Sequence, residues 1–283
     1  MTTTSTPTSR AASCVRHHER PPQIETPGVR TWVARGANFI VAVSSVTAGA
    51  RLARSEQPDE YMVFLPDAAA TISAGRESIE AAPESLTIVP PGASEIVAAQ
   101  DGQIVCIYSH RAEDLLALAD NAADYAQPTP EVAPLVPWPT PADGFRLRHY
   151  PLSAFTQPDS NMRIFRSTNL MVNVMLPRPV PRDVRKLSPH SHADFEQGSL
   201  AVRGRWVHHL RYPWTADMNA WRDDEHLEVD SPSLAVVPPK VIHTSRNVNE
   251  GGSWLLDIFA PPRMDFSSKP GAVANAGDYP MPA

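Results

Sequence analysis

Two histidines separated by a single residue, His190 and His192, give the strongest chemical signal in the sequence. In an extended segment, residues two apart point to the same face, so both imidazoles can reach one point. Glu196 and Gln197 follow closely, and a third histidine, His243, stands further along the chain. Imidazole, carboxylate and amide groups held by a β scaffold are ligands for Fe, Mn, Ni, Cu or Zn. The spacing therefore predicts a divalent metal site with coordination positions left open for substrate or water.

The identity of the fourth ligand stays open between Glu196 and Gln197. Neighbouring residues of a strand face opposite ways, so only one of the two can reach the metal. If Gln197 points inward, Arg203 does so too and the pocket is polar, whereas an inward Glu196 brings the apolar Leu200 into the lining. A glutamine ligand would leave more of the metal's charge unneutralised, which favours an anionic or enolisable oxygen ligand.

Further side chains near these histidines could take part in catalysis. His208 and His209 are adjacent on the next expected strand, so one of them must face the interior, where it could act as acid, base or substrate ligand. Arg203 is a third candidate for such a role. Three basic residues ahead of the first histidine could hold a substrate carboxylate, or could form a solvated loop: Arg182, Arg185 and Lys186.

The elements that must position these residues are short strands. Two stretches, 29–110 and 145–263, break into short runs rich in β-branched and aromatic residues, separated by Gly, Pro, Asp and Asn. Such runs are typical of an all-β sandwich or barrel. With 30 prolines against 13 glycines, the composition also argues against a helical bundle.

The rest of the chain separates or flanks these two stretches. Residues 111–126 change to a helical period, and residues 127–144 carry six prolines and should form an extended connector. The expected division is a disordered tail (1–28), a first β domain (29–110), a helix with a Pro-rich linker (111–144), a metal-binding β domain (145–263) and a C-terminal tail (264–283).

An internal repeat relates the two β domains. The segment SLTIVPP at 85–91 matches SLAVVPP at 233–239 at five of seven positions. In this alignment Glu95 takes the place of His243, and the first copy contains no pair of histidines like that of the second. Two tandem copies of one β domain are therefore expected, with a metal site in the second copy alone.

These motifs resemble those of the cupin superfamily, G(x)5HxH(x)3-4E(x)6G and G(x)5PxG(x)2H(x)3N. The opening glycine of the first motif is absent here, and Lys240 replaces the middle glycine of the second. Through the repeat, the resemblance covers most of residues 29–261. The matching residues are His190, His192, Glu196 or Gln197, Gly204, Pro238, His243 and Asn247.

The resemblance implies a bicupin, with two jelly-roll barrels in tandem joined by the helix and the Pro-rich linker. It implies a metal-dependent enzyme with Fe(II) at the site, or alternatively Mn(II), Ni(II) or Zn(II), acting on a small polar organic molecule. An Fe(II) dioxygenase is ranked first, because a neutral site with open positions can bind both O2 and a chelating enolate. The alternatives are a sugar or keto-acid isomerase or lyase, and a non-catalytic small-molecule-binding protein. A homodimer is also implied.

Composition excludes several partners. A formal charge of −6 offers no basic surface for nucleic acid, and no apolar stretch is long enough to span a membrane. The two cysteines, Cys14 and Cys106, give no disulfide framework, so a cytosolic location is expected.

Overall fold

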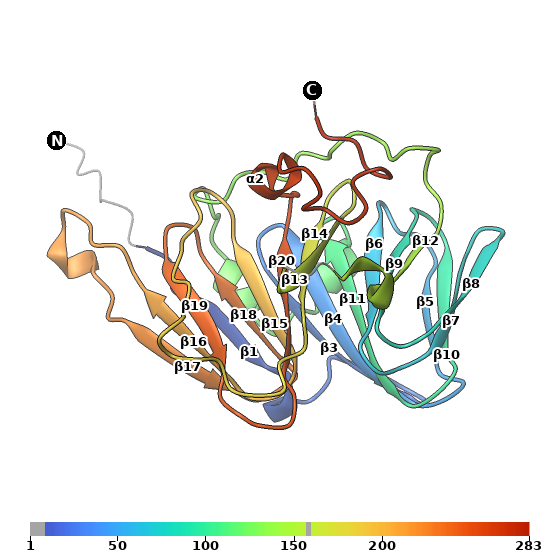
Figure 1. Ribbon diagram of the computed structural model, residues 1–283, viewed down its shortest axis with the longest axis horizontal. Coiled ribbons are helices and arrows are strands. Elements are labelled where there is room, and N and C mark those ends of the chain that lie inside the picture. Colours follow the sequence, from blue (N-terminus) through green and yellow to red (C-terminus); the bar gives the residue numbers. More distant parts are fainter. Residues whose placement is uncertain (1–8, 157–159, 283) are drawn as a thin grey trace.

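The computed structural model describes residues 9–156 and 160–282 and consists almost entirely of antiparallel β-sheet (Figure 1). Two sandwiches stand side by side, each built from a large and a small sheet. The N-terminal barrel is built around residues 24–109 and the C-terminal barrel around residues 162–259. The predicted fold class, all-β with two jelly-roll barrels in tandem, is confirmed.

The N-terminal barrel pairs a seven-stranded sheet with a four-stranded one. Central strands such as β6 and β9 are buried along their whole length, whereas β10 in the small sheet alternates between buried and half-buried residues, because one of its faces meets solvent. In spatial order the sheets are β12 (Arg148–Pro151), β9 (Ser85–Val89), β6 (Tyr61–Leu65), β11 (Gly102–Ser109), β4 (Phe39–Val46), β3 (Val29–Arg35) and β2 (Ile24–Thr26); and β5 (Arg51–Arg54), β10 (Ser94–Ala98), β7 (Ala70–Ala74) and β8 (Glu77–Ala81).

The C-terminal barrel repeats this order with a six-stranded and a three-stranded sheet. β15 lies between β18 and β20, as β6 lies between β9 and β11. Every strand of the C-terminal barrel therefore has a counterpart in the N-terminal one, which has β2 and β5 in addition. The sheets are β1 (Ser13–Arg16), β18 (Ser233–Val237), β15 (Gln197–Arg203), β20 (Trp254–Phe259), β14 (Met171–Met175) and β13 (Met162–Arg166); and β17 (Glu225–Val229), β16 (Trp206–Arg211) and β19 (Ile242–Asn247).

The barrels exchange their edge strands. β1 belongs by sequence to the first half but pairs antiparallel with β18, while β12 precedes the second barrel but pairs with β9. The prediction that residues 1–28 form a disordered tail is therefore wrong for β1 and β2. Val15 lies opposite Leu234 with 4% of its surface exposed, and the backbone groups of β1 occupy the hydrogen-bonding edge of β18.

The prediction of a single helix over residues 111–126 is wrong in its length. The structure has α1 (Glu113–Leu116), followed by a 3-10 turn, η2 (Ala122–Tyr125). The break lies at Asn121, whose side chain donates to Arg35 O and accepts from Arg35 N, at 2.8 and 2.9 Å, and so ties the chain to β3. An asparagine that bonds to a backbone in this way competes with the helical hydrogen bonds. The other short helical segments are η1 (His17–Glu19), η3 (Leu152–Phe155), η4 (Met218–Ala220) and α2 (Met264–Ser267).

The largest hydrophobic cluster lies between the two large sheets and joins the barrels. It includes Phe64 from one barrel and Trp254 from the other, whose rings meet edge to face at 5.1 Å. A second cluster fills the N-terminal barrel, whereas the further apolar clusters of the C-terminal barrel are small among the described residues. The interior of that barrel holds buried polar side chains, among them His192, His243 and Asp257.

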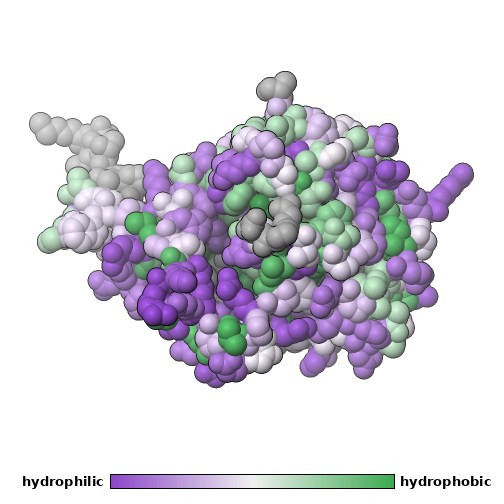
Figure 2. Space-filling view, viewed as in Figure 1, coloured by the Kyte–Doolittle hydropathy of each residue, from purple (hydrophilic) through white to green (hydrophobic). Residues whose placement is uncertain are grey.

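The surface of the molecule is mixed. Hydrophilic side chains gather at the lower left of the face in Figure 2, in front of the C-terminal barrel. Across residues 9–156 and 160–282, no helix is both long and apolar enough to cross a membrane.

Candidate metal centre

Three histidines meet in the C-terminal barrel, as the sequence predicts; His192 and His243 are buried and His190 is exposed. His190 and His243 sit side by side across a short antiparallel bridge, in which His190 N donates to His243 O (3.1 Å) and His243 N donates to His190 O (2.8 Å). His192 lies two residues further along the same extended segment. The ligand atoms of the three imidazoles all lie within 4.8 Å of one another.

Backbone carbonyls orient two of these rings. Nδ1 of His243 faces Val241 O at 2.9 Å, and Nδ1 of His190 faces Ser188 O at 3.0 Å. A carbonyl can only accept, so each Nδ1 carries the proton and each Nε2 keeps its lone pair. This arrangement is usual for metal-ligating histidines. The Nε2 atom of His243 is buried and has no hydrogen-bond partner among the described residues.

Burial keeps the imidazoles of His192 and His243 neutral. Burial lowers the pKa of His192 to about 3, and Arg263 and the two neighbouring histidines act in the same direction, against the hydrogen bond that Gln197 Oε1 accepts from His192 Nε2. Burial likewise lowers the pKa of His243 to about 4. A neutral imidazole is the form that binds a metal, so the site is ready for one near neutral pH.

Gln197, and not Glu196, faces the histidines. Its Oε1 lies 2.9 Å from Nε2 of His192. Glu196 points to the opposite face of β15, where its carboxylate accepts from Ala37 N at 2.6 Å and pairs with Arg10. The structure therefore brings Gln197 to the histidine cluster and places Glu196 in the interface between the barrels.

A buried carboxylate, Asp257, fixes the amide of Gln197. Gln197 Nε2 donates to Asp257 Oδ1 at 3.0 Å, and Ser199 Oγ donates to the same oxygen at 2.7 Å. Gln197 Oε1 is thereby directed towards His192. Burial raises the pKa of Asp257 to about 6, although both hydrogen bonds act against the rise. Asp257 was not predicted as a site residue. The feature that could have marked it is a single acidic residue within the otherwise mostly apolar run 253–260.

A cavity of about 130 Å³ is lined by His190, His243 and Gln197 of this site. Arginines from two segments also line it: Arg178 and Arg182 from the connection after β14, and Arg263 from the connection after β20. Arg182 is held by Ser245 O at 2.9 Å, and Arg263 lies against the ring of Phe259, with its carbon Cζ 4.7 Å from the ring centroid. Of the basic loop considered from the sequence, Arg182 thus reaches the cavity. Arg185 instead has an 85% exposed side chain that pairs with Asp183.

The three other catalytic candidates lie in different places. His208 faces the barrel interior with 1% exposure, and its Nδ1 lies 2.7 Å from the hydroxyl of Ser245, a residue of the cavity wall. His209 faces outward and meets His226 with their Nδ1 atoms 2.9 Å apart, so a role for His209 at the site is not supported. Arg203 lies exposed at the strand end, after a shift of register in the ladder between Ala201 and Arg203, and does not line the cavity.

The tandem double-sheet barrels, with a histidine cluster in the second, have the jelly-roll fold of cupin proteins. No protein-family model matches the sequence, and a search of curated proteins gave no match either. Solved structures do match in fold. AerE from Microcystis aeruginosa is 10% identical with a TM-score of 0.57, covering 86% of this chain and 97% of that chain.

Two further structures show how widely this fold is used. An oxalate decarboxylase from Lactobacillus farciminis, in complex with formate, is 14% identical with a TM-score of 0.56, covering 88% of this chain and 86% of that one. The 7S globulin of Momordica charantia is 12% identical with a TM-score of 0.57, covering 88% and 84%. At such identities the likeness shows the fold alone, and the chemistry must be argued from the site.

Proposed function

We propose that this protein is a metal-dependent enzyme acting on a small anionic organic molecule. The divalent metal is held by His190, His192 and His243, with the amide oxygen of Gln197 as fourth ligand. The observation that carries the proposal is the buried, unpartnered Nε2 of His243 within the three-histidine cluster. A buried polar atom without a partner costs about 1–3 kcal/mol, and a bound metal would remove that cost.

The charge around the site supports an anionic substrate. Three neutral imidazoles and an amide contribute no negative charge, so the metal's double positive charge stays uncompensated by its ligands. The guanidinium groups of Arg178 and Arg182 add positive charge around the same cavity, whereas that of Arg263 is paired with Asp265. A carboxylate or enolate is the group that such surroundings stabilise, and a cavity of about 130 Å³ admits only a small one.

The reaction ranked first is oxidative cleavage by O2, as in an Fe(II) dioxygenase that places both oxygen atoms in the products. When bound, Fe(II) would supply Lewis acidity and reactivity towards O2. The protein's own part is to bind and position the substrate. Arginines hold its anionic group, Gln197 is kept in orientation by Asp257, and Phe259 closes the wall against water.

A non-oxidative lyase, in particular a decarboxylase, is the second candidate. The small arginine-lined cavity suits a short carboxylate, and an oxalate decarboxylase is among the solved structures with this fold. In this reaction the metal would act as Lewis acid alone, and a protein group would return a proton to the product.

Metal content tests the site itself. We expect purified wild-type protein to hold about one divalent ion per chain by elemental analysis, and His190→Ala and His243→Ala to hold less than about a tenth of that. His209→Ala is the matched control, because this histidine lies outside the site. Unchanged metal content in both site variants would refute the proposal.

Turnover then separates the two reactions. Small carboxylates and enolisable keto acids are screened with the iron-loaded enzyme in an oxygen electrode, and with the Zn- or Mg-loaded enzyme under nitrogen. Oxygen uptake that requires iron supports the dioxygenase. Release of CO2 without oxygen supports the decarboxylase, and a protein that binds these acids without turnover would be a binding protein instead.

A further inference from the structure

The N-terminal barrel contains a cavity of its own, of about 350 Å³, at the place that corresponds to the metal site. Tyr61 opens β6 and lines this cavity, as Gln197 opens β15 and lines the other. Cys106 lies opposite Ala42 in the β11–β4 ladder, and Asp257 lies opposite Asn173 in the β20–β14 ladder. The same interior position is thus hollow in both barrels, but the lining side chains differ.

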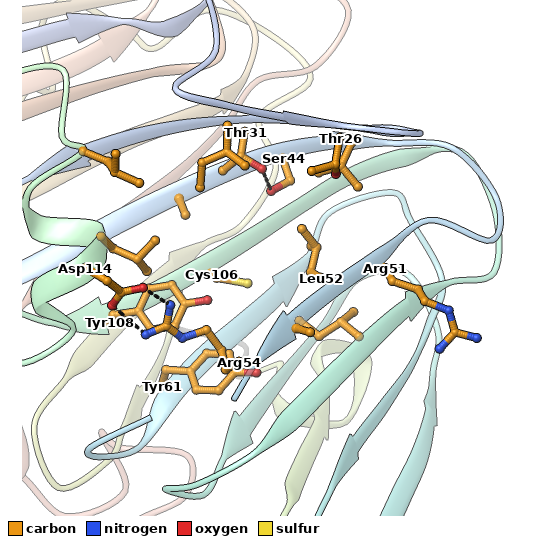
Figure 3. Close-up of a pocket in the computed structure, with 17 residues that line it drawn as sticks. Thr26, Thr31, Ser44, Arg51, Leu52, Arg54, Tyr61, Cys106, Tyr108 and Asp114 are labelled. Atoms are coloured by element: carbon orange, nitrogen blue, oxygen red, sulfur yellow. Dashed lines mark hydrogen bonds and ion pairs between the residues drawn. The ribbon is translucent and has the colours of Figure 1, made fainter. Parts of the chain in front are cut away.

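Metal ligands are replaced here by aromatic and apolar groups. Tyr61 and Tyr108 stack with their ring centroids 4.8 Å apart and their planes 19° from parallel. Both are almost fully buried, and Leu52 and Ile96 extend the apolar wall around them. Figure 3 shows the two rings at one side of the cavity with the sulfur of Cys106 beside them. A wall of this kind offers flat apolar contact area.

The cavity presents no uncompensated charge. Arg54 donates to both oxygens of Asp114, at 2.6 and 2.8 Å, and to Gln57 at 3.1 Å, so its charge is neutralised (Figure 3). Burial raises the pKa of the Cys106 thiol to about 12, and it raises the pKa of both tyrosines above the usual range. These groups are neutral at physiological pH, and an ionic ligand would find no counter-ion.

Hydrogen bonding is available at one point of the opposite wall. The hydroxyl groups of Thr31 and Ser44 lie 2.8 Å apart on neighbouring strands (Figure 3). Each hydroxyl can accept as well as donate, so the pair can serve a ligand with a hydroxyl or N–H group. The cavity therefore combines an aromatic wall with a pair of hydroxyl groups that can bond a ligand.

We propose that this cavity is a second, metal-independent binding site for an uncharged, flat aromatic molecule that carries one hydroxyl or N–H group. Its size falls within the roughly 300–1,000 Å³ of small-molecule sites, at the end that suits one or two fused rings. The ring lies along the stacked tyrosines, and the polar group reaches Thr31 and Ser44. The site is independent of the proposed function, because it shares no residue with the metal centre.

Phenol and indole are suitable probes for calorimetric titration of the full chain, before and after treatment with EDTA. We expect saturable binding of both, unchanged by EDTA and by His243→Ala in the other barrel. Benzoate tests the requirement for a neutral ligand and cyclohexanol the requirement for a flat one. Each should bind at least about tenfold more weakly than phenol. Absence of saturable binding of phenol and indole, or equal affinity for benzoate, would overturn the proposal.

Two variants locate the binding. Ala42→Phe fills the cavity from β4 and should weaken indole binding at least about tenfold, and Ser44→Leu should remove the polar contact and weaken it by less. Should Ala42→Phe fail to fold, the smaller Ala42→Leu gives a second readout by the same titration. It should weaken indole binding severalfold. Unchanged affinity for indole in both Ala42→Leu and Ser44→Leu would place the bound probe elsewhere.

Discussion

In both barrels, the strand at the middle of the large sheet is preceded by a buried glutamate that reaches into the opposite half. Before β6, Glu60 accepts from Thr168 N at 3.1 Å and from Tyr279 Oη at 2.7 Å. Before β15, Glu196 accepts from Ala37 N at 2.6 Å and from Tyr125 Oη at 3.1 Å. We call Glu60 and Glu196 the interface glutamates.

The partners of the interface glutamates are also equivalent. Gly36 N donates to Phe39 O in the turn before β4, and Ser167 N donates to Leu170 O in the turn before β14. These are the turns that supply the two backbone donors to the glutamates. The two tyrosines are placed alike as well, since Tyr125 follows α1 and Tyr279 follows α2. The contacts that join the barrels have thus been retained in both copies.

Side chains that face the barrel interiors have instead diverged. Where the C-terminal barrel has Gln197 and Asp257, the N-terminal barrel has Tyr61 and Cys106. Glu95, which the repeat aligns with His243, does not face inward but lies half exposed and pairs with Arg51. The order of the matching strands is the same, so the difference in chemistry comes from a few inward positions. Duplication here preserved the face that builds the molecule and changed the face that could bind a ligand.

The largest expected effect concerns the interface glutamates. Glu60→Ala and Glu196→Ala should each lower the free energy of unfolding by about 2–4 kcal/mol, because each leaves buried donors unpaired. Urea unfolding measures this, and elemental analysis should show metal retained by Glu196→Ala. Metal loss without loss of stability in that variant would return Glu196 to the ligand set.

Exchanging the inward residues at the start of β6 and β15 sharpens the comparison. Gln197→Tyr should weaken metal binding by about 10- to 100-fold, measured by competition with a chelator. Tyr61→Gln should give no metal site in the N-terminal barrel, where no histidine is among the described residues that line the cavity. Full metal affinity in Gln197→Tyr would show that three histidines suffice.

A smaller effect is expected at Asp257. Asp257→Leu removes the oxygen that accepts from the Gln197 amide, so metal affinity should fall about tenfold, whereas Asp257→Asn keeps one acceptor oxygen and should have a smaller effect. Ser199→Ala, which removes the neighbouring hydroxyl, should also have a weaker effect of the same sign. An unchanged metal affinity in Asp257→Leu would mean that Gln197 needs no orientation.

The smallest expected effect is a dependence of the free energy of unfolding on pH, caused by a histidine that follows one of the exchanged strands. His17 follows β1 as Leu152 follows β12, and both are buried. Burial lowers the pKa of His17 from 6.5 to about 4. The unfolded chain therefore binds the proton first, and the contribution of the neutral histidine to stability is lost as the pH falls from about 6.5 towards 4. At pH 5.5 the loss should be about 1 kcal/mol, and His17→Leu should remove it. An identical pH profile in wild type and variant would contradict this account.

Sequence reasoning reached the tandem barrels and the three histidines because these depend on local patterns. The repeated SLTIVPP and SLAVVPP heptads marked equivalent strands, and the spacing of His190 and His192 fixed their common face. The choice between Glu196 and Gln197 stayed open, because strand alternation shows that one of them faces inward but not which one. The partners that settle their placement, Ala37 and Asp257, lie far away in sequence.

The strand exchange was beyond sequence reasoning for a related reason. β1 carries four residues, too few for a period, and its partner lies more than two hundred residues away. The broken helix was missed because the contact of Asn121 with β3 is tertiary. The homodimer, the cytosolic location and the identity of the metal stay predictions.

The exchange of β1 and β12 has a consequence for the origin of the chain. Each half completes its neighbour's sheet with its own first strand. Two separate copies of such a unit would give a closed dimer in which each subunit lends a strand to the other, the arrangement known as domain swapping. When the copies are joined end to end through a proline-rich connector, the exchanged strands become contacts within one molecule. Once the two halves are covalently joined, one interior is free to lose the histidines that the other keeps.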